Sequence, residues 1–385
     1  MTSMPAPAGV GEAAPPRVLL VTGHASIGGI EQIVVSIARH LGERGWPIEV
    51  AVPLDREAEA FAAWAQAQGV TVHAHRELVP HYRSRGWRDV ARLRGVVRSH
   101  RPDVVNLHVG YTISLKEALG LRLAVGRRTV ISFHDPDLPV GRVATQTRLG
   151  ARAARMFVAN SQATQEMLTT LGLPGGEVRL IRCGVEEPGS LPGRDEARAE
   201  LAIPADAFVV ASAGRQERPK GFHELIEAVA RMGGDRLPPL LMIAGDGRDR
   251  AEFEALAAER LGERARFLGR VASLHTLYAA SDVFALASHH EGFGLVYVEA
   301  ALHGVPSVGY AHRGVPDAVL HERTGLLAPL GDVDAVARYL ERLQDDPQLR
   351  QRLGVAARER ALGELSAATM ADRYAEVFRA VAGRR

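Results

Sequence analysis

Glu291 and Glu299 lie eight positions apart in the stretch EGFGLVYVE and are the side chains best placed to do chemistry. The apolar run Asp282 to Ser288 precedes them and suits a buried parallel strand, whereas Leu295 to His303 has helical composition. Glu291 is therefore expected where a strand ends, and Glu299 about one turn into a helix, leaning back toward its start. Two carboxylates facing a polyhydroxylated ligand are good hydroxyl acceptors. On spacing alone, a glycine loop with two solvated glutamates is the alternative.

The start of that helix falls between Gly292 and Gly294, and no Ser, Thr, Asp or Asn is present to cap it. The first backbone N–H groups are thus left for another acceptor, and a ligand phosphate is a natural one. Glycine also lets a ligand approach the backbone closely, because it has no side chain. The stretch predicts an anion site made largely of backbone.

A second glycine-containing loop, Gly214 to Gly221, follows a strand-like run and precedes an amphipathic helix. Arg215 is a fork-shaped donor and Lys220 a point charge, and both suit a diphosphate. Of the 47 basic residues only Lys116 and Lys220 are lysines, so a lysine at 220 departs from the chain's preference for arginine. The alternative is a solvated charge at a helix start.

The first strand-like run, Arg17 to Gly23, leads into a loop that contains Gly28 and Gly29. The loop lacks the Lys-Ser/Thr pair of a Walker A motif and the G-x-G-x-x-G of a dinucleotide fingerprint. What remains is a glycine-rich loop that opens a helix and can approach an anion. A tight turn is the alternative.

His134 follows the β-rich residues ISF, which places an imidazole at the carboxyl end of a strand. It could hydrogen-bond a substrate hydroxyl or shuttle a proton, although a chain with 15 histidines also places some by chance. Asp135 and Asp137 could suggest a metal-bound diphosphate, but a turn centred on proline explains them more simply. We predict no metal.

Length and composition restrict the class of protein. A chain of 385 residues exceeds the size of most single cores, which favours two domains. A formal net charge of +2 argues against a general nucleic-acid binder. A single cysteine, Cys183, excludes an internal disulfide framework and favours a cytoplasmic location. No apolar run approaches the roughly 18 residues that span a bilayer.

Short β-rich runs alternate with helical stretches along most of the chain, which predicts parallel sheets covered on both faces. A Pro/Gly-rich break at 187–193 interrupts the rhythm. We therefore predict an α/β fold of two doubly wound, Rossmann-like domains that face a cleft. The predicted divisions are a disordered tail at 1–16, domains at 17–190 and 191–365, and a final helix at 366–385 that can pack on either domain, including back on the first. The strands are expected at 17–23, 48–53, 70–75, 103–109, 129–134, 156–160, 178–182, 208–213, 240–244, 266–268, 283–287 and 306–309.

Residues 83–101 carry seven arginines against one aspartate, with Trp87, Val90, Leu93 and Val97 near helical spacing. Such a basic amphipathic helix can lie on anionic lipid. It is also typical of the outer helix of an α/β domain, with a solvated arginine face.

Taken together, these motifs resemble family 4 of the retaining glycosyltransferases, which have the two-domain GT-B architecture. The resemblance covers nearly the whole chain from Arg17 and is densest from Phe267 to Pro329. It implies a nucleotide-diphospho sugar, with UDP or GDP as the nucleotide, bound in the cleft and mostly on the second domain. It also implies transfer of a hexosyl unit to an acceptor hydroxyl with retention, without a metal or other cofactor.

The resemblance assigns roles to the residues that match the family's motifs. Arg215 and Lys220 would bind the diphosphate beside Gly214, and Glu299 the ribose hydroxyls. His134 would lie near the transferred sugar. The donor sugar and the adjoining phosphate would be held by Glu291 and the loop that follows it, which comprises Gly292, Phe293, Gly294 and Leu295. The first domain would border the phosphates through Gly28 and Gly29.

Two positions depart from the family's pattern. Cys183 stands where the family often has Asn, and Asp317 where it has Glu. A sugar-nucleotide epimerase of the same architecture and a catalytically inactive sugar-nucleotide binder remain alternative functions. An NAD-dependent oxidoreductase is disfavoured because the fingerprint glycines are missing.

Overall fold

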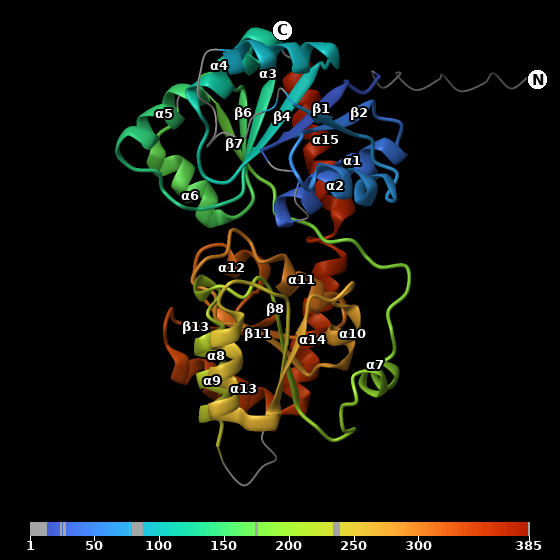
Figure 1. The fold of residues 1–385 in the computed structure, drawn as a ribbon, viewed down its shortest axis with the longest axis vertical. Helices are drawn as coiled ribbons and strands as arrows, with labels where there is room; N and C mark the ends of the chain where they lie inside the picture. The colour runs from blue at the N-terminus through green and yellow to red at the C-terminus, as the bar shows by residue number, and fades with distance from the viewer. Residues whose placement is uncertain are drawn as a thin grey trace, which may run out of the picture.

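The computed structural model describes residues 14–383 except 24, 26–27, 77, 79–87, 174–175 and 234–238. Its chain forms two stacked α/β domains (Figure 1), each built on one parallel sheet, which confirms the fold class predicted from the sequence. Strands buried on both faces are nearly continuous apolar runs, as parallel sheets require.

The first domain holds a seven-stranded sheet in the order β3-β2-β1-β4-β5-β6-β7. The order reverses at β1, where Val18 pairs with Ile48 on one side and Val104 on the other. At such a reversal the carboxyl ends of neighbouring strands open a crevice that binds ligands. The strands are β1 (Val18–Thr22), β2 (Ile48–Pro53), β3 (Val72–His75), β4 (Val104–Val109), β5 (Thr129–Phe133), β6 (Met156–Ala159) and β7 (Glu177–Leu180).

Helices cover both faces of this sheet. Val18 and Leu20 join a core with α1 and α2, whereas Leu19 and Val21 point to the opposite face, toward a core with α3 and α4. The helices are α1 (Gly29–Glu43), α2 (Ala58–Gln66), α3 (Arg88–Ser99), α4 (Leu115–Val125), α5 (Gly141–Ala151) and α6 (Gln162–Leu171).

The second domain holds a six-stranded sheet in the order β10-β9-β8-β11-β12-β13, and it reverses between β8 and β11. Its strands are β8 (Val209–Ala213), β9 (Leu240–Ala244), β10 (Ala265–Gly269), β11 (Val283–Leu286), β12 (Ser307–Tyr310) and β13 (Gly325–Ala328). Its helices are α7 (Arg194–Glu200), α8 (Phe222–Arg231), α9 (Arg250–Leu261), α10 (His275–Ala280), α11 (Leu295–Leu302), α12 (Val315–Ala318), α13 (Val333–Asp345) and α14 (Pro347–Leu362), with 3-10 turns η2 (Arg218–Lys220) and η3 (Gly262–Arg264).

The chain crosses between the domains twice, and the two crossings lie side by side. Val185 N–H donates to Leu365 O at 2.9 Å, and Ala367 N–H donates back to Val185 O at 2.9 Å. The second crossing leads into α15 (Ala367–Gly383), which packs on α1 in the first domain (Figure 1). There the rings of Trp46 and Phe378 meet edge to face, with centroids 6.4 Å apart.

The observed elements differ from the predicted ones mainly at their ends. No strand is predicted from the sequence at β13, whose four residues GLLA include no β-branched or aromatic side chain. Residues 88–99 of the predicted basic helix form α3, and residues 83–87, Trp87 among them, fall outside the described residues. Within the described part of the chain, no helix is both long and apolar enough to cross a membrane.

Candidate active site

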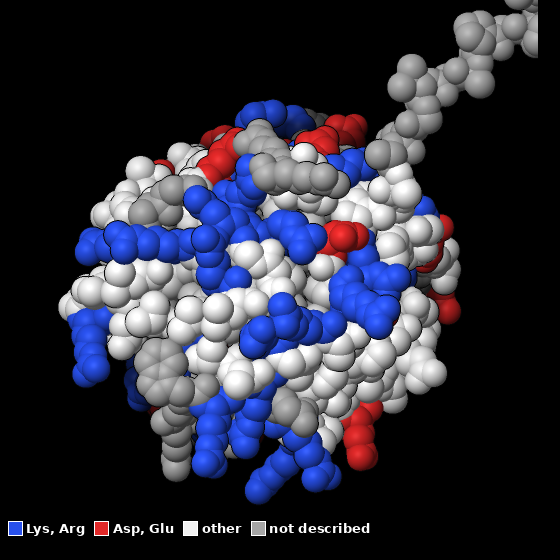
Figure 2. Space-filling model, turned by 90° about the horizontal axis from the view of Figure 1, so that it is seen from above, with Lys and Arg blue, Asp and Glu red and all other residues white. Residues whose placement is uncertain are grey.

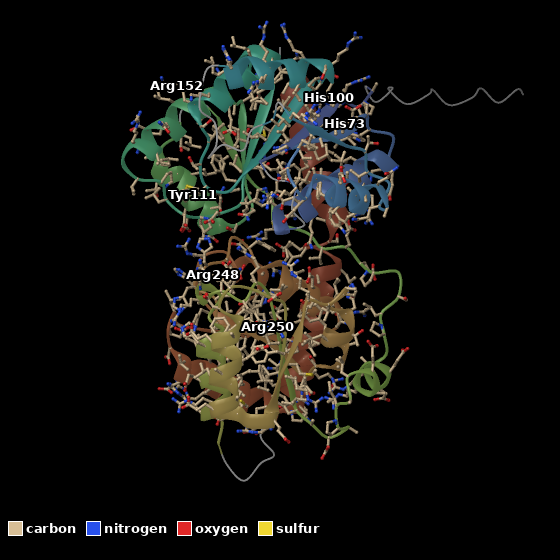
Figure 3. The ribbon with its side chains drawn as sticks, viewed as in Figure 1. His73, His100, Tyr111, Arg152, Arg248 and Arg250 are labelled. Carbon is tan, nitrogen blue, oxygen red and sulfur yellow. The ribbon has the colours of Figure 1, made fainter. Side chains whose placement is uncertain are left out.

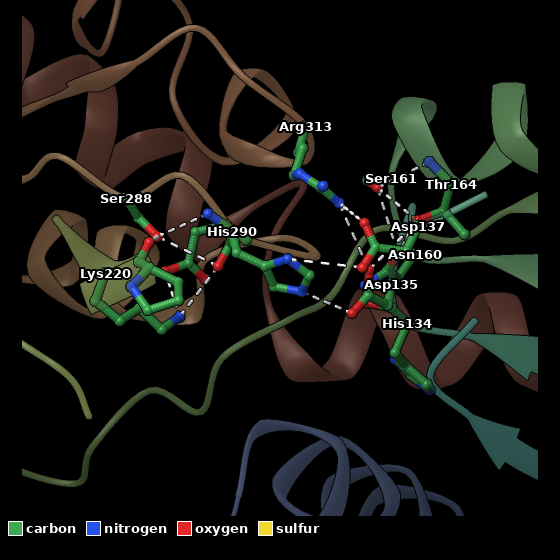
Figure 4. A network of polar contacts seen from close by, with 12 residues as sticks. His134, Asp135, Asp137, Asn160, Ser161, Thr164, Lys220, Ser288, His290 and Arg313 are labelled. Atoms are coloured by element: carbon green, nitrogen blue, oxygen red, sulfur yellow. Dashed lines mark hydrogen bonds and ion pairs between the residues drawn. The ribbon is translucent and has the colours of Figure 1, made fainter. Parts of the chain in front are cut away.

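Lys220 and Glu291 form an ion pair where the second sheet reverses. Lys220 Nζ donates to Glu291 Oε1 at 2.6 Å and to His290 O at 3.3 Å (Figure 4). Lys220 closes η2 after β8, and Glu291 follows β11, so the two loops converge from neighbouring strands. Both side chains are largely buried, with 19% and 10% of their surface exposed. The sequence placed Glu291 at the end of a strand and Lys220 in a loop before a helix, but only the fold shows that they meet.

Gly221 is required for this convergence. It has a φ of 68° and is the N-cap of α8, and a side-chain carbon there would lie 1.7 Å from Ala287 O. Only a residue without a side chain can bring the start of α8 so close to the end of β11.

Helix α11 begins as the sequence predicts, at the second glycine of the EGFG stretch. Gly294 is its N-cap with a φ of 93°, and no side chain caps the helix. Its first turn therefore presents unpaired backbone N–H groups and the positive end of the helix dipole. Glu299 lies one turn further on, and Tyr278 Oη donates to its Oε2 at 3.1 Å. Burial raises the pKa of Glu299, and the bond from Tyr278 partly offsets this.

A cavity of about 550 Å³ lies between the two domains. It is bordered by α1 from the first domain and by α10 and α11 from the second, and Glu299 and Leu295 form part of its wall. A side-chain carbon at Gly29 would lie 3.6 Å from Leu295 Cδ1, so the first turns of α1 and α11 face each other. Other residues on the wall are Gln32, Ser36, Glu186, Ser273 and His275.

Glu31 lies beside Gly28 at the start of α1 and is not among the residues predicted from the sequence. It is 5% exposed in the first turn of α1, whose N-cap Gly28 has no side chain to cap the helix. Burial raises the pKa of Glu31 to about 7, although hydrogen bonds from the backbone N–H groups of Glu31 and Gly28 oppose the shift. A side-chain carbon at Gly28 would lie 2.9 Å from Glu31 Oε2. An acidic residue three positions after a glycine N-cap was the available signal.

His134 is buried at the interface, with 6% of its surface exposed. Its Nε2 shares a hydrogen bond of 2.9 Å with Nδ1 of His108, a residue the sequence analysis did not select. Its own Nδ1 is buried without a partner among the described residues. Burial lowers the pKa of His134 to about 4, so the ring is neutral at physiological pH. A neutral ring with an unused nitrogen favours hydrogen bonding to a ligand over proton shuttling.

A polar latch of four side chains joins the domains beside His134 (Figure 4). His290 Nε2 bonds Asp135 Oδ2 at 2.8 Å, and Arg313 pairs with Asp137 while its Nη1 lies 3.8 Å from Asp135 Oδ1. The bond to Asp135 raises the pKa of His290. Burial alone would raise the pKa of Asp135, but the bond from His290 and nearby positive charge bring it below its ordinary value. Asp135, Asp137 and His290 are close enough to share a cation, yet they are already paired with opposite charge.

Asp317 and Cys183, the two departures from the family's pattern, are both buried. Asp317 Oδ1 accepts from Arg182 Nε and its Oδ2 from the backbone N–H of Gln162, both at 2.7 Å. Its carboxylate therefore ties the second domain to the first. Burial raises the pKa of the Cys183 thiol to about 12, which makes it a poor nucleophile.

Arg215 does not join the Lys220–Glu291 pair. Its side chain is 75% exposed and its Nη1 lies 3.5 Å from Glu217 Oε2. Gly214 directly follows β8 and packs against the neighbouring loop, where a side-chain carbon at Gly245 would lie 2.0 Å from Gly214 O. The other predicted residues of the second domain, from Gly292 to Leu295, lie together between Glu291 and α11.

Two facing Rossmann-like domains with a cavity between their helix starts define the GT-B class of glycosyltransferase folds. Two family models match: Glycosyltransferase Family 4 over residues 27–187 and Glycosyl transferases group 1 over residues 193–360. The chain belongs to the family 4 glycosyltransferases of GT-B architecture.

Individual relatives agree with this assignment. The chain is 37% identical over 223 residues to the lipopolysaccharide core biosynthesis glycosyltransferase LpsE of Rhizobium meliloti, a match that covers 58% of this chain but under two thirds, 63%, of LpsE. It is 30% identical over 312 residues to the D-inositol 3-phosphate glycosyltransferase of Streptomyces avermitilis, covering 73% of this chain and 67% of that one. The crystal structure of Anabaena HepE in complex with UDP shares the fold, with a TM-score of 0.78, 24% identity and coverage of 94% of this chain and 100% of HepE.

Proposed function

We propose that this glycosyltransferase moves a hexosyl unit from a nucleotide-diphospho sugar, with UDP or GDP as the nucleotide, to an acceptor hydroxyl with retention of configuration. One observation carries the proposal: the uncapped starts of α1 and α11 face each other at the cavity that Glu299 borders. The positive dipole ends of two helices at one site favour a diphosphate. HepE, which shares the fold, was crystallised with UDP and with UDP-glucose.

The reaction needs charge stabilisation more than proton transfer. The acceptor oxygen forms a bond to the anomeric carbon while the bond from that carbon to the phosphate oxygen breaks, and the diphosphate leaves with the electron pair. The acceptor's proton passes to the leaving phosphate oxygen. Lys220 and the start of α11 would stabilise the negative charge that develops on this oxygen. Arg215 would close on the diphosphate once the donor is bound.

Sugar and ribose hydroxyls would be recognised by separate groups. Glu291, held by Lys220, would accept hydroxyls of the transferred sugar, and Glu299, held by Tyr278, those of the ribose. The free Nδ1 of neutral His134 would hydrogen-bond the sugar. Gly28 and Gly29 would let the phosphates and the acceptor approach the first domain.

Donor turnover in matched lysine variants tests the proposal, because the chain has only two lysines. A thermal-shift panel of UDP-, GDP-, ADP- and dTDP-sugars first identifies the donor, since a specific ligand stabilises the protein that binds it. Lys220→Ala, Glu291→Ala and Arg215→Ala should then each lower turnover by about two orders of magnitude or more, while Lys116→Ala should not. Unchanged turnover in all three would sink the proposal.

Product analysis separates the alternatives. NMR of the glycoside should show the anomeric configuration of the donor, and excess EDTA should leave the rate unchanged. Isomerisation of the donor sugar without an acceptor would favour the epimerase, and binding without transfer to any hydroxyl the inactive binder.

We also propose a cytoplasmic location with electrostatic contact to an anionic membrane surface. Cys183 is free and buried, so the fold needs no oxidising compartment. Arginines gather on the outer end of the first domain (Figure 2), and exposed ones on α3 are Arg88, Arg92, Arg94 and Arg98. The apolar face of α3 is buried in its own domain, which leaves only charge for the lipid. Co-sedimentation with vesicles containing phosphatidylglycerol should therefore be lost in high salt, and binding that resists salt would contradict this.

A further inference from the structure

Three imidazoles and a carboxylate gather at the β3 edge of the first sheet. Glu49 lies on β2, His73 and His75 on β3, and His100 directly after α3; Figure 3 shows His73 and His100 together at this edge. Ala51 pairs with His73 and Pro53 with His75, so these strand residues share the face that α3 covers. None of the four borders the cavity between the domains.

Glu49, His73 and His100 each bring one ligand atom into a close cluster. Glu49 Oε2 lies 2.6 Å from His100 Nδ1 and 3.8 Å from His73 Nε2, and all three atoms lie within 4.8 Å of one another. Ligand atoms about 2.0–2.1 Å from a tetrahedral Zn²⁺ lie about 3.4 Å apart, so side-chain shifts of about an ångström would complete the geometry. The rings of His73 and His100 meet edge to face, with centroids 4.8 Å apart.

The second nitrogen of His100 is also held. His75 Nε2 lies 3.0 Å from His100 Nε2, so a His100 that uses Nδ1 as a ligand donates its other N–H to His75. Metal-binding histidines are commonly oriented by such a bond on the far side of the ring.

The ring nitrogen Nε2 of His73 indicates that a ligand is missing. Its Nε2 is buried and makes no hydrogen bond among the described residues, which is unfavourable unless a ligand occupies it. The side chains of His73 and Glu49 are 39% and 34% exposed, so an ion can enter from solvent. Imidazole and carboxylate together suit Zn²⁺, Co²⁺ or Ni²⁺ better than Mg²⁺ or Ca²⁺.

We propose that Glu49, His73 and His100 bind a divalent transition-metal ion, Zn²⁺ by preference, with His75 as a positioning residue. The ion joins β2, β3 and the end of α3, and its fourth ligand is water. Its role is structural, because the site stands apart from the cavity between the domains. Glu49 supplies the negative charge that a cation requires beside the arginines of α3.

The test is a Co²⁺ titration of the full chain, untagged and stripped with chelator. We expect one equivalent to give the intense visible bands of tetrahedral Co²⁺, and Zn²⁺ to displace it and raise the melting temperature. His73→Ala and His100→Ala should abolish the bands, Glu49→Gln should weaken binding at least tenfold, and His75→Ala should weaken it about 10- to 100-fold at unchanged stoichiometry.

His290→Ala is the matched control, because Asp135, Asp137 and His290 form the other close cluster among the described residues. It should keep the bands unchanged. Bands that survive in both His73→Ala and His100→Ala, bands lost in His290→Ala, or the absence of binding at tenfold excess would overturn the proposal. Far-UV circular dichroism of each metal-free variant should match that of the metal-free parent, and a variant that differs is replaced by Gln at the same position.

Discussion

The backbone of Gly292 in the second domain packs against the carbonyl oxygen of His134 in the first, so closely that a side-chain carbon at 292 would lie 1.9 Å from that oxygen. Asn160 Nδ2 fixes the same oxygen with a bond of 2.9 Å. A glycine that the sequence analysis assigned to ligand approach therefore also sets how closely the domains meet.

Gly292→Ala should hold the domains apart, because the clash is with backbone and cannot be relieved by a rotamer change. We expect donor turnover to fall at least about tenfold, with overpacking costing about 1–3 kcal/mol. The checks are steady-state kinetics and urea unfolding. Gly189→Ala in the linker, where an added carbon meets nothing within 4 Å, is the control. Full activity in Gly292→Ala would show that the contact does not matter.

The Lys220–Glu291 pair should show strong coupling in a double-mutant cycle. Lys220→Met leaves a buried carboxylate without its partner, which should destabilise the fold by about 3 kcal/mol. Lys220→Met combined with Glu291→Leu should cost less than the sum of the two single changes. Urea unfolding measures each free energy, and strictly additive values would contradict the coupling.

The latch between the domains should depend on pH. The pKa of His290 is raised above 6.5. The contribution of protonated His290 to the stability of the latch is therefore complete below pH 6.5 and is lost as pH rises through the raised value. The pKa of Asp135 is lowered below 3.8, so its contribution is complete above pH 3.8 and is lost as pH falls through the lowered value. Small-angle scattering should therefore show a more open molecule at pH 9 than at pH 6. His290→Gln should remove that difference, and an equal difference in the variant would exclude His290 as its source.

Glu31 should make the protein less stable as pH rises through the acid range. Its pKa is about 7 in the fold against an ordinary 4.5, so the folded state binds the extra proton between these values. The contribution of Glu31 to the free energy of unfolding is complete below pH 4.5. It falls by about 3 kcal/mol as pH rises to 7, at about 1.4 kcal/mol per pH unit. Melting temperatures of Glu31→Gln, which keeps the shape without the charge, should decline less over this range. Parallel curves for the two proteins would refute the assignment.

The sequence predicts the fold well where burial imposes a pattern. Val283–Leu286 and Val209–Ala213 are recognisable because a strand covered on both faces must be apolar throughout. The start of α11 is equally clear, since a glycine pair without a capping residue marks it. β13 was not predicted because its residues GLLA form strands only weakly.

Tertiary contacts are what the sequence could not supply. Lys220 and Glu291 are 71 positions apart and meet only because β8 and β11 are neighbours in the sheet. In the sequence, His108 is one residue of a largely apolar strand. Only the fold shows that it hydrogen-bonds His134. Glu31 gave a local signal, but its raised pKa follows from burial, which the sequence does not show.

The return of α15 to the first domain has a consequence for synthesis of the chain. Trp46 and the core around α1 are completed by Phe378 and its neighbours, more than 300 positions later. As the chain leaves the ribosome, residues 194–362 can fold while the first domain still lacks one of its helices. The first domain is synthesised first but completes its fold last. A premature stop before residue 367 should therefore leave an apolar surface exposed, which chaperones recognise.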